Sequence, residues 1–264
     1  MNLRTTFFVA CAVMGLSRAA LAEPATTNQW EHTLSLGVTE TSGNTEMRMG
    51  TASWLSEFRS LGGDLVRLSA DGQNGKEKGQ KTADNVKGDA NYKCAFDGSL
   101  YAVADVAGLY DSVADISYRI TPSVGLGCFI LKDSANSFSV DIGPAYVFEK
   151  VGGVKDDYAA FRASERFERK LGAKAKCWEA VEYIPKVSDF DVYNIAGEIG
   201  AEAPLTSSIN LRLVFADRYQ NIPAPDHKRN DTQIVGAVAQ RASPCRSPHR
   251  RRTGLPGLSR QECA

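Results

Sequence analysis

The sequence lacks any long apolar segment beyond its N-terminus. After residue 22, no apolar run approaches the roughly 18 residues that a membrane-spanning helix needs. This absence excludes a helical membrane protein. It leaves a membrane β-barrel open, because half of the residues in each barrel strand face the interior and dilute the hydropathy.

The chain is also poor in the residues that hold metals and disulfides. Five cysteines follow the N-terminal segment, an odd number that cannot complete a disulfide framework. Cys94, Cys128 and Cys177 each lie within an expected strand and show no metal-like spacing. We interpret them as small apolar side chains, and we expect no metal site and no cofactor.

Basic residues are fewer than acidic ones outside the C-terminal tail. The formal net charge of zero conceals a split, because residues 23–240 have a net charge of about −7 and the last 24 residues about +5. A nucleic-acid-binding protein needs a basic surface on its folded part. We therefore expect no nucleic-acid partner.

The first 22 residues have the pattern of a secretory signal peptide. Arg4 supplies a positive charge, residues 7–16 form an apolar stretch, and Ala20 and Ala22 flank a small-x-small cleavage site. A lipoprotein interpretation of Cys11 fits less well, because almost no apolar stretch precedes it. We expect residues 1–22 to be removed and the remainder to be exported.

Two long segments near the middle of the chain alternate between apolar and polar or small residues. Segment 118–130 places Tyr118, Ile120 and Val124 on one face, and segment 138–149 repeats the pattern after a polar turn. Strands of soluble domains usually stop at roughly 5–6 residues. These continue for about 11–13, near the length at which a tilted strand crosses a bilayer. We therefore predict a hairpin of a membrane β-barrel with its apolar side toward lipid.

The same alternation recurs along the chain and predicts twelve antiparallel strands, an even number as single-chain bacterial barrels require. The expected strands are 30–39, 46–59, 64–70, 84–96, 100–109, 118–130, 138–149, 158–171, 176–184, 193–202, 209–216 and 232–239. With the N-terminus in the periplasm, the connections after odd-numbered strands include the two longest, a polar loop at 71–81 and another at 219–231.

Three local features disturb the pattern. The strand at 46–59 has mixed faces, which predicts a β-bulge. Pro122 and Pro144 each remove a backbone donor in the middle of a strand, so we expect bulges there near the membrane boundary. Alternation ends at residue 240, and the Pro-, Ser- and Arg-rich segment that follows is typical of disorder.

These patterns divide the chain into a signal peptide at 1–22, an outer-membrane β-barrel domain at 23–239 and a basic, disordered tail at 240–264. Barrels of this kind generally finish on an aromatic residue, and none ends the last expected strand. We hypothesise that the tail reflects a reading-frame change, which the nucleotides near codon 239 would test.

Five segments together carry a family resemblance. They are GVTETSGNTE at 37–46, YDSVADISYRITPSVGLG at 110–127, DIGPAYVFEK at 141–150, DYAAFRASERFERKL at 157–171, and Ala224-Pro225 followed by Asn230-Asp231. In order and spacing the chain resembles the salt-induced outer-membrane protein family, domain of unknown function 481, over nearly all of residues 30–239. The resemblance implies an outer-membrane β-barrel and brings no activity.

A lipid hydrolase or acyltransferase is one functional class to weigh, and it needs a nucleophile, a histidine base and an orienting acid. His32 lies on the apolar face of the first expected strand, and His227 lies among charged residues of the last loop. We interpret the first as a membrane-boundary side chain and the second as solvated. We expect the protein not to be an enzyme.

The remaining candidates are charged residues on the polar faces of the strands, which a barrel would turn toward its lumen. They are Arg119, Asp141, Glu149, Glu198, Glu202 and Arg212, with Lys87, Asp89 and Lys93 beside them. Such charges either fill the interior as salt bridges or line a narrow pore.

We therefore expect an outer-membrane barrel of a Gram-negative bacterium that is structural or a small-solute conduit linked to salt or osmotic response. Its expected partners are outer-membrane lipid, lipopolysaccharide and the barrel-assembly machinery. An outer-membrane lipid-modifying enzyme and a soluble periplasmic β-protein that binds apolar ligands remain the alternatives.

Overall fold

The computed structural model describes residues 28–41, 47–96, 98–172, 175–206 and 209–242. The segments expected to be a signal peptide and a tail lie outside this range, apart from residues 240–242. No helix in the described part of the chain is long and apolar enough to cross a membrane.

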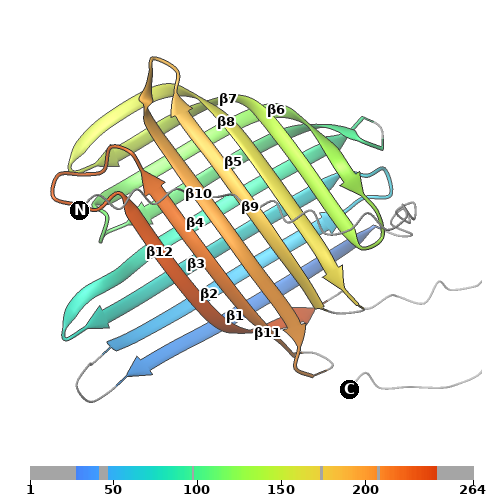
Figure 1. The fold of residues 1–264 in the computed structure, drawn as a ribbon, viewed down its shortest axis with the longest axis horizontal. Helices are drawn as coiled ribbons and strands as arrows, with labels where there is room; N and C mark the ends of the chain where they lie inside the picture. Colours follow the sequence, from blue (N-terminus) through green and yellow to red (C-terminus); the bar gives the residue numbers. More distant parts are fainter. Residues whose placement is uncertain (1–27, 42–46, 97, 173–174, 207–208, 243–264) are drawn as a thin grey trace, which may run out of the picture.

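The chain forms a closed antiparallel barrel of twelve strands, as the alternation predicts (Figure 1). Each strand pairs with its neighbours in sequence, and β12 returns to pair with β1. The strands are β1 Gln29–Thr41, β2 Met47–Arg59, β3 Leu65–Glu77, β4 Gln80–Ala95, β5 Leu100–Asp111, β6 Ile116–Lys132, β7 Asn136–Val151, β8 Val154–Leu171, β9 Ala175–Lys186, β10 Asp189–Pro204, β11 Ile209–Gln220 and β12 Asn230–Ala242.

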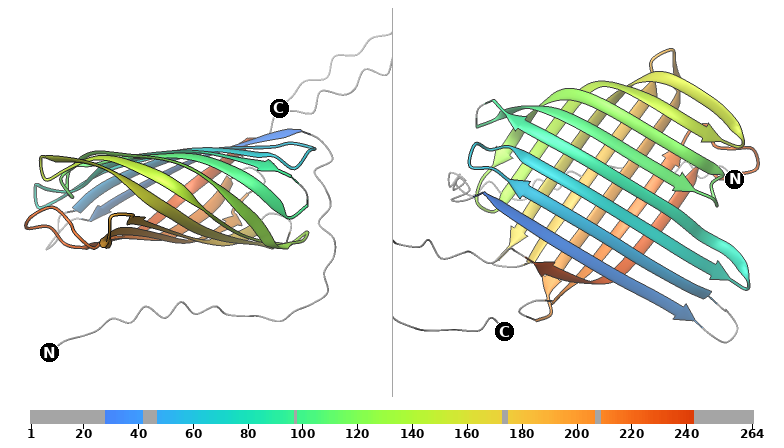
Figure 2. Two further views of the ribbon diagram at one scale, coloured as in Figure 1. Left: turned by 90° about the horizontal axis from the view of Figure 1, so that it is seen from above. Right: turned by 180° about the vertical axis from the view of Figure 1, so that it is seen from behind.

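The barrel is flattened, so that two walls face each other across the lumen. Strands β9–β12 cross in front of β1–β5 in Figure 1, and Figure 2 shows the thin profile from above and the opposite wall from behind. We call the end with the connections after odd-numbered strands the loop end. The other end, where β1 begins and β12 finishes, is the terminal end.

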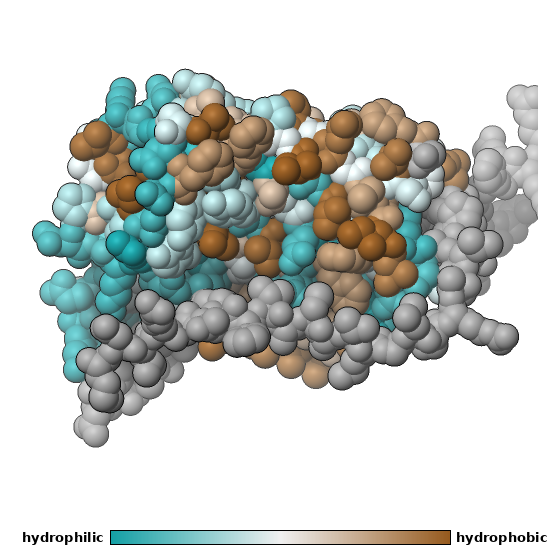
Figure 3. All heavy atoms as spheres, turned by 45° about the horizontal axis from the view of Figure 1, so that its top comes forward, coloured by the Kyte–Doolittle hydropathy of each residue, from teal (hydrophilic) through white to brown (hydrophobic). Residues whose placement is uncertain are grey.

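Alternation along the strands separates an apolar outside from a polar inside. On β6, Val124 is 58% exposed on the outer face, whereas Thr121 is 4% exposed and faces the interior. Leu34, Leu36 and Val238 are exposed on the outer face where β1 meets β12. Figure 3 shows hydrophobic residues spread over one face of the wall, with hydrophilic residues gathered toward its left end.

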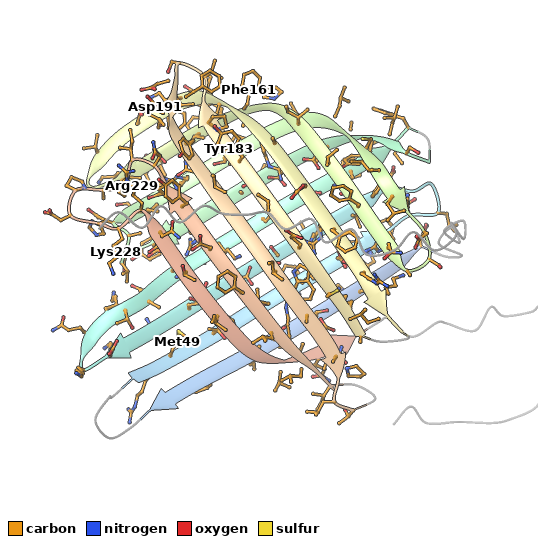
Figure 4. The ribbon with its side chains drawn as sticks, in the orientation of Figure 1. Met49, Phe161, Tyr183, Asp191, Lys228 and Arg229 are labelled. Atoms are coloured by element: carbon orange, nitrogen blue, oxygen red, sulfur yellow. The ribbon has the colours of Figure 1, made fainter. Side chains whose placement is uncertain are left out.

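Aromatic side chains cluster at both ends of the outer face. Near the terminal end, Trp30 packs against Phe58 with ring centroids 5.0 Å apart. Toward the loop end, Tyr193 stacks on Tyr219 and also contacts Tyr183, with centroid separations of 5.9 and 5.7 Å. In Figure 4, Tyr183 and Phe161 lie in the upper part of the view, and Lys228 and Arg229 lie at its left, in the connection before β12. Paired aromatic belts of this kind flank the apolar band of membrane barrels.

The predicted polar loop at 71–81 is wrong. β3 continues to Glu77, β4 begins at Gln80, and the turn between them consists of Lys78 and Gly79, both with positive φ. The polar residues are therefore strand residues near the loop end, where both faces are hydrophilic and alternation is lost. Of the two long loops expected at this end, the one before β12 remains, spanning 221–229.

The predicted bulges in β2 and at the two prolines are also wrong. β2 keeps one register with both neighbours, and its mixed faces arise because Leu55 is buried on the inner face. Pro122 and Pro144 lie along the β6–β7 contact, where the pairs Ser123–Ala145 and Leu126–Ile142 keep the same register. Each proline removes a backbone N–H donor, so a hydrogen bond between strands is lost locally. Because neither proline inserts an extra residue, the register of β6 and β7 does not shift.

Close contacts with neighbouring strands explain two of the glycines in the β6–β7 hairpin. A Cβ atom added to Gly143 would collide with the carbonyl oxygen of Val124. One added to Gly127 would overlap the ring of Tyr101, its partner on β5. At the terminal end, Asp133 accepts hydrogen bonds from the side chain and backbone of Asn136 and from the backbone of Ala135, which hold the pKa of Asp133 below its usual range.

Candidate functional site: the charged lumen

The interior of the barrel contains a cavity of about 1390 Å³. Its lining is mixed, with serine and threonine beside many charged side chains from both walls. Part of the interior toward the loop end is filled instead by an apolar cluster of Ala145, Val147, Tyr158, Ala160 and Ile184 on β7, β8 and β9. The open part of the lumen therefore has a mixed lining that carries many charges, and it lies beside this cluster.

Arg162 on β8 is the centre of the largest ion-pair network in the lumen. Its guanidinium donates to Asp141 on β7 at 2.8 Å and to Glu182 on β9 at 2.5 Å. It also lies 3.8 Å from Asp105 on β5. One cationic side chain thus holds three carboxylates from strands that are not all adjacent.

Asp141, a residue predicted to face the lumen, is bound by several donors at once. Its Oδ1 accepts from Ser164 at 2.7 Å, and its Oδ2 accepts from Tyr101 at 3.0 Å and from Lys93 at 3.3 Å. With the contact to Arg162, both carboxylate oxygens are occupied. Asp141 is therefore a fixed structural member of the network.

A second polar group bridges the lumen at the loop end. Arg119 on β6 pairs with Glu149 on β7 through Nε and Oε2, at 2.5 Å. The side-chain amide of Gln220 on β11 is assigned so that its oxygen faces Arg119. In this orientation the oxygen accepts two further hydrogen bonds from the same guanidinium. Beside it, Arg218 on β11 lies 3.3 Å from Asp111 on β5, so the two walls are joined by charge.

A third group surrounds Trp178, whose ring fills the space over Gly200. The indole N–H donates to Glu198 at 2.5 Å, and the guanidinium of Arg212 lies 4.9 Å from the ring centroid. Nearby, Asn210 donates to Glu202 at 2.6 Å. These contacts join β9, β10 and β11 toward the terminal end.

The six residues proposed from the sequence therefore lie in three separate groups along the lumen. Asp141 belongs to the central network, Arg119 and Glu149 to the loop end, and Glu198, Glu202 and Arg212 to the Trp178 group. Sequence reasoning missed Arg162, Glu182 and Asp105, which connect the central network. The signal of Arg162 was weak, because charged residues occupy both faces in the second half of β8.

The two histidines of the described chain are not near this lumen network. His32 is exposed on the outer face of β1, stacks on Trp30, and its Nδ1 lies 2.9 Å from the hydroxyl of Ser56 on β2. Ser56 is only 1% exposed, so a substrate could not reach its oxygen. His227 is hydrogen-bonded through Nδ1 to the carbonyl oxygen of Pro225 in the last connection.

Within the described ranges, no group of three or more histidine, cysteine or acidic residues is arranged to hold a metal ion. Cys94, Cys128 and Cys177 are half-buried free thiols. Their register places each on the outer face, beside exposed apolar residues such as Leu126 and Ile199. The three cysteines therefore form part of the outer wall.

Several solved structures share the barrel shape at low similarity. The NanC porin aligns with a TM-score of 0.48 at 9% identity, covering 80% of this chain and 98% of that one. The KdgM porin aligns with a TM-score of 0.44 at 9% identity and the same coverage. The translocator domain of the autotransporter NalP from Neisseria meningitidis aligns with a TM-score of 0.42 at 12% identity, covering 82% of this chain and 88% of that one. Likeness at this level is too remote to support a function.

A search among curated proteins finds no match. The family model described as "Protein of unknown function, DUF481" matches residues 34–235, from the middle of β1 to the middle of β12. This match covers most of the barrel, and the chain belongs to the DUF481 family.

Proposed function

We propose that the barrel spans the outer membrane of a Gram-negative bacterium as a non-enzymatic conduit for small solutes. The observation that carries this proposal is a charged cavity of about 1390 Å³ inside a wall whose outer face is apolar. A closed barrel leaves no unpaired strand edge, which is the condition for a sheet in lipid. Its expected surroundings are outer-membrane lipid and lipopolysaccharide, and its insertion would require the barrel-assembly machinery.

The polar interior argues against a soluble periplasmic protein that binds apolar ligands. Such a protein would bury its apolar side chains inside and expose polar ones to water. Here Val124, Leu126 and Ile142 are exposed outside, whereas Asp105 and Asp141 are buried inside. The burial pattern thus favours lipid as the outer environment.

The lipid-modifying enzyme is also less favoured. A hydrolase would need the Ser56 oxygen to be accessible and His32 to be oriented by an acid. Ser56 is covered instead, and within the described structure the ring nitrogen Nδ1 of His32 faces the Ser56 hydroxyl and no orienting carboxylate. The hydrogen bond between Ser56 and His32 satisfies a buried hydroxyl that would otherwise lie unpaired.

The ion pairs that join the two walls favour a second candidate, a plugged barrel with a purely structural role. Arg218–Asp111 joins β11 to β5 of the opposite wall, and Arg162–Asp105 joins β8 to β5, three strands away. If these pairs persist, they narrow the passage at two levels. Both candidates contain the cavity, so the cavity does not distinguish them. Measurements of conduction do, because only an open barrel passes ions.

We expect the refolded barrel to conduct in a planar lipid bilayer. Discrete ohmic steps in potassium chloride would support a conduit, and silence across repeated insertions would favour the plugged barrel. A role in salt or osmotic response is the finer part of the proposal and rests on the family resemblance. If the protein has this role, a strain without the gene should resume growth more slowly than the parent after a salt shift. Equal recovery of growth in the two strains would count against the role.

A further inference from the structure

β1 and β12 close the barrel over only part of their length. The two strands pair at five positions, from His32–Ala242 to Leu36–Val238, all in the terminal-end half of the seam. Continued in the same register, residues 37–41 of β1 would face residues 233–237 of β12. Within the described chain no pair is formed there, although β1 stays paired with β2 and β12 with β11 at these positions. Closure at this seam is therefore incomplete toward the loop end.

The two strands part at Gly37 and Gly236. A Cβ atom added to Gly37 would lie 2.6 Å from the carbonyl oxygen of Gly236, so the two backbones still touch here. Beyond this point they diverge, and the loop-end tip of β1 lies well apart from the start of β12 both in Figure 1 and in the view from behind in Figure 2. The result is a wedge-shaped slot in the wall that widens toward the loop end.

The slot joins the lumen to the outer face. Beside it, Gln233 and Val235 of β12 and Ser35 of β1 line the cavity of about 1390 Å³. On the outer side, Val38 is 85% exposed and Ile234 is 63% exposed. A molecule in the slot therefore meets the charged cavity on one side and apolar side chains on the other.

The unpaired backbone of the slot requires water beside it. Irregular or unpaired backbone at membrane depth is tolerated where it lines a water-filled space, and the slot opens on the cavity. A strand from another polypeptide fits less well, because a wedge does not offer two parallel edges at the spacing of a sheet. A strand paired with one edge alone would leave a new unpaired edge in lipid.

The length of the slot matches an acyl chain. The unpaired residues 37–41 of β1 extend roughly 17 Å along the strand, comparable with the roughly 15 Å hydrocarbon depth of one leaflet. A chain of this length can lie in the slot while its polar headgroup lies in the charged lumen. A simple ion gains nothing by leaving the lumen sideways, and a purely apolar molecule gains nothing by entering it.

We propose that the slot between β1 and β12 is a lateral portal, through which single-chain amphiphiles pass between the lumen and the leaflet on the loop-end side. The solute class is that of molecules with one acyl chain and a polar headgroup. This inference rests on the proposed conduit and names a class of solute for it.

Cysteine pairs test whether the seam is open in lipid. The background is the refolded protein in vesicles, with the five cysteines after residue 22 replaced by alanine. Leu34→Cys with Gln240→Cys faces across the ladder, at a separation where disulfides form. Thr39→Cys with Val235→Cys occupies positions that would face each other if the ladder continued. Mild oxidation should join the first pair and leave the second reduced.

Transfer of a fluorescent lysophosphatidylcholine tests the portal itself. The probe is placed in both leaflets of the vesicles, and albumin outside extracts the inner half only as it crosses. Wild-type vesicles should release the inner half faster than protein-free vesicles. A bismaleimide bridge between the cysteines at 39 and 235 should abolish this gain and leave ion conduction in place. The same bridge between the cysteines at 34 and 240 is the matched control and should change neither.

A second variant obstructs the slot without a reagent. A Cβ atom at Gly236 meets no atom within 4 Å, so Gly236→Trp adds its ring at the narrow end of the slot and should slow the transfer. Gly72→Trp is its control, because Gly72 has the same open space but lies on β3, which is paired on both sides. This control should transfer the probe as wild type does.

Three results would overturn the portal and leave the conduit standing. They are equal joining of the two cysteine pairs, a conducting wild type that transfers no more probe than protein-free vesicles, and transfer that neither the bridge at 39 and 235 nor Gly236→Trp reduces. A wild type that is silent in the planar bilayer would overturn the conduit, and the inference with it.

Discussion

Replacing Arg162 by methionine should destabilise the barrel more than any other single change in the lumen. Methionine keeps most of the side-chain volume but leaves Asp105, Asp141 and Glu182 without their shared cation. Breaking a buried ion pair by removing one partner costs about 3–5 kcal/mol. We therefore expect the free energy of unfolding to fall by about this amount, as measured by urea titration of the refolded protein in lipid.

Arg59→Met provides the matched control. Arg59 also faces the interior, but it lies at the terminal end, is largely exposed, and contacts Glu57 at 3.8 Å. Exposed ion pairs contribute about 0–1 kcal/mol, so the control should unfold nearly as wild type does. If the two variants lost equal stability, or if Arg162→Met lost none, Arg162 would not be the organising cation of the lumen.

A charge introduced on the outer face should be the second large effect. Val124 lies in the middle of β6 with exposed Ile120 and Leu126 on the same face. In a bilayer, arginine at the midplane of a barrel wall costs about 2–4 kcal/mol. We expect Val124→Arg to lower the free energy of unfolding in lipid vesicles by this amount.

The same substitution on the inner face tests whether the effect comes from lipid. Ala107 on β5 pairs with Thr121 and lines the cavity, so an arginine there would enter a polar, hydrated space. Its cost should be much smaller than that of Val124→Arg. The reverse order of the two costs would mean that the apolar face is not in contact with acyl chains.

Period-two alternation was enough to predict the closed barrel and the facing of most strands. The pattern is strong where one side meets an apolar phase and the other meets water, as on β6 and β7. It fails at 71–81, because strand ends beyond the apolar belt are wet on both faces and have no reason to alternate. It also misjudged Pro122 and Pro144, because a lost backbone donor does not require an inserted residue.

The lumen was harder to predict than the wall. Alternation places Asp141, Glu198 and Arg212 on inner faces, but it does not say which charges meet. Arg162 reaches Asp105 three strands away, and Arg218 reaches Asp111 from the opposite wall. Such contacts depend on how the barrel closes and flattens, and neither property is encoded within one strand.

A charged residue on the outer face of β8 kept the central network from being predicted from the sequence. In β8, Arg162, Ser164 and Arg166 face inward, but Glu165 faces outward between Val140 and Val181. An acidic residue on the apolar side makes the run 162–170 appear charged on both faces. The cation that joins three strands was therefore not separable from its neighbours until the register was known.

The three tryptophans of the chain allow the contact between wall and lipid to be measured directly. Trp54 is 40% exposed on the outer face, whereas Trp178 is 3% exposed and lies inside the barrel with its indole N–H on Glu198. Variants that retain only one of these, with phenylalanine at the other two positions, would be refolded into vesicles with brominated acyl chains, which quench fluorescence on contact. We predict strong quenching of Trp54 and little of Trp178. Equal quenching of the two, or unquenched Trp54 in a protein that stays monodisperse without detergent, would contradict the membrane-spanning barrel.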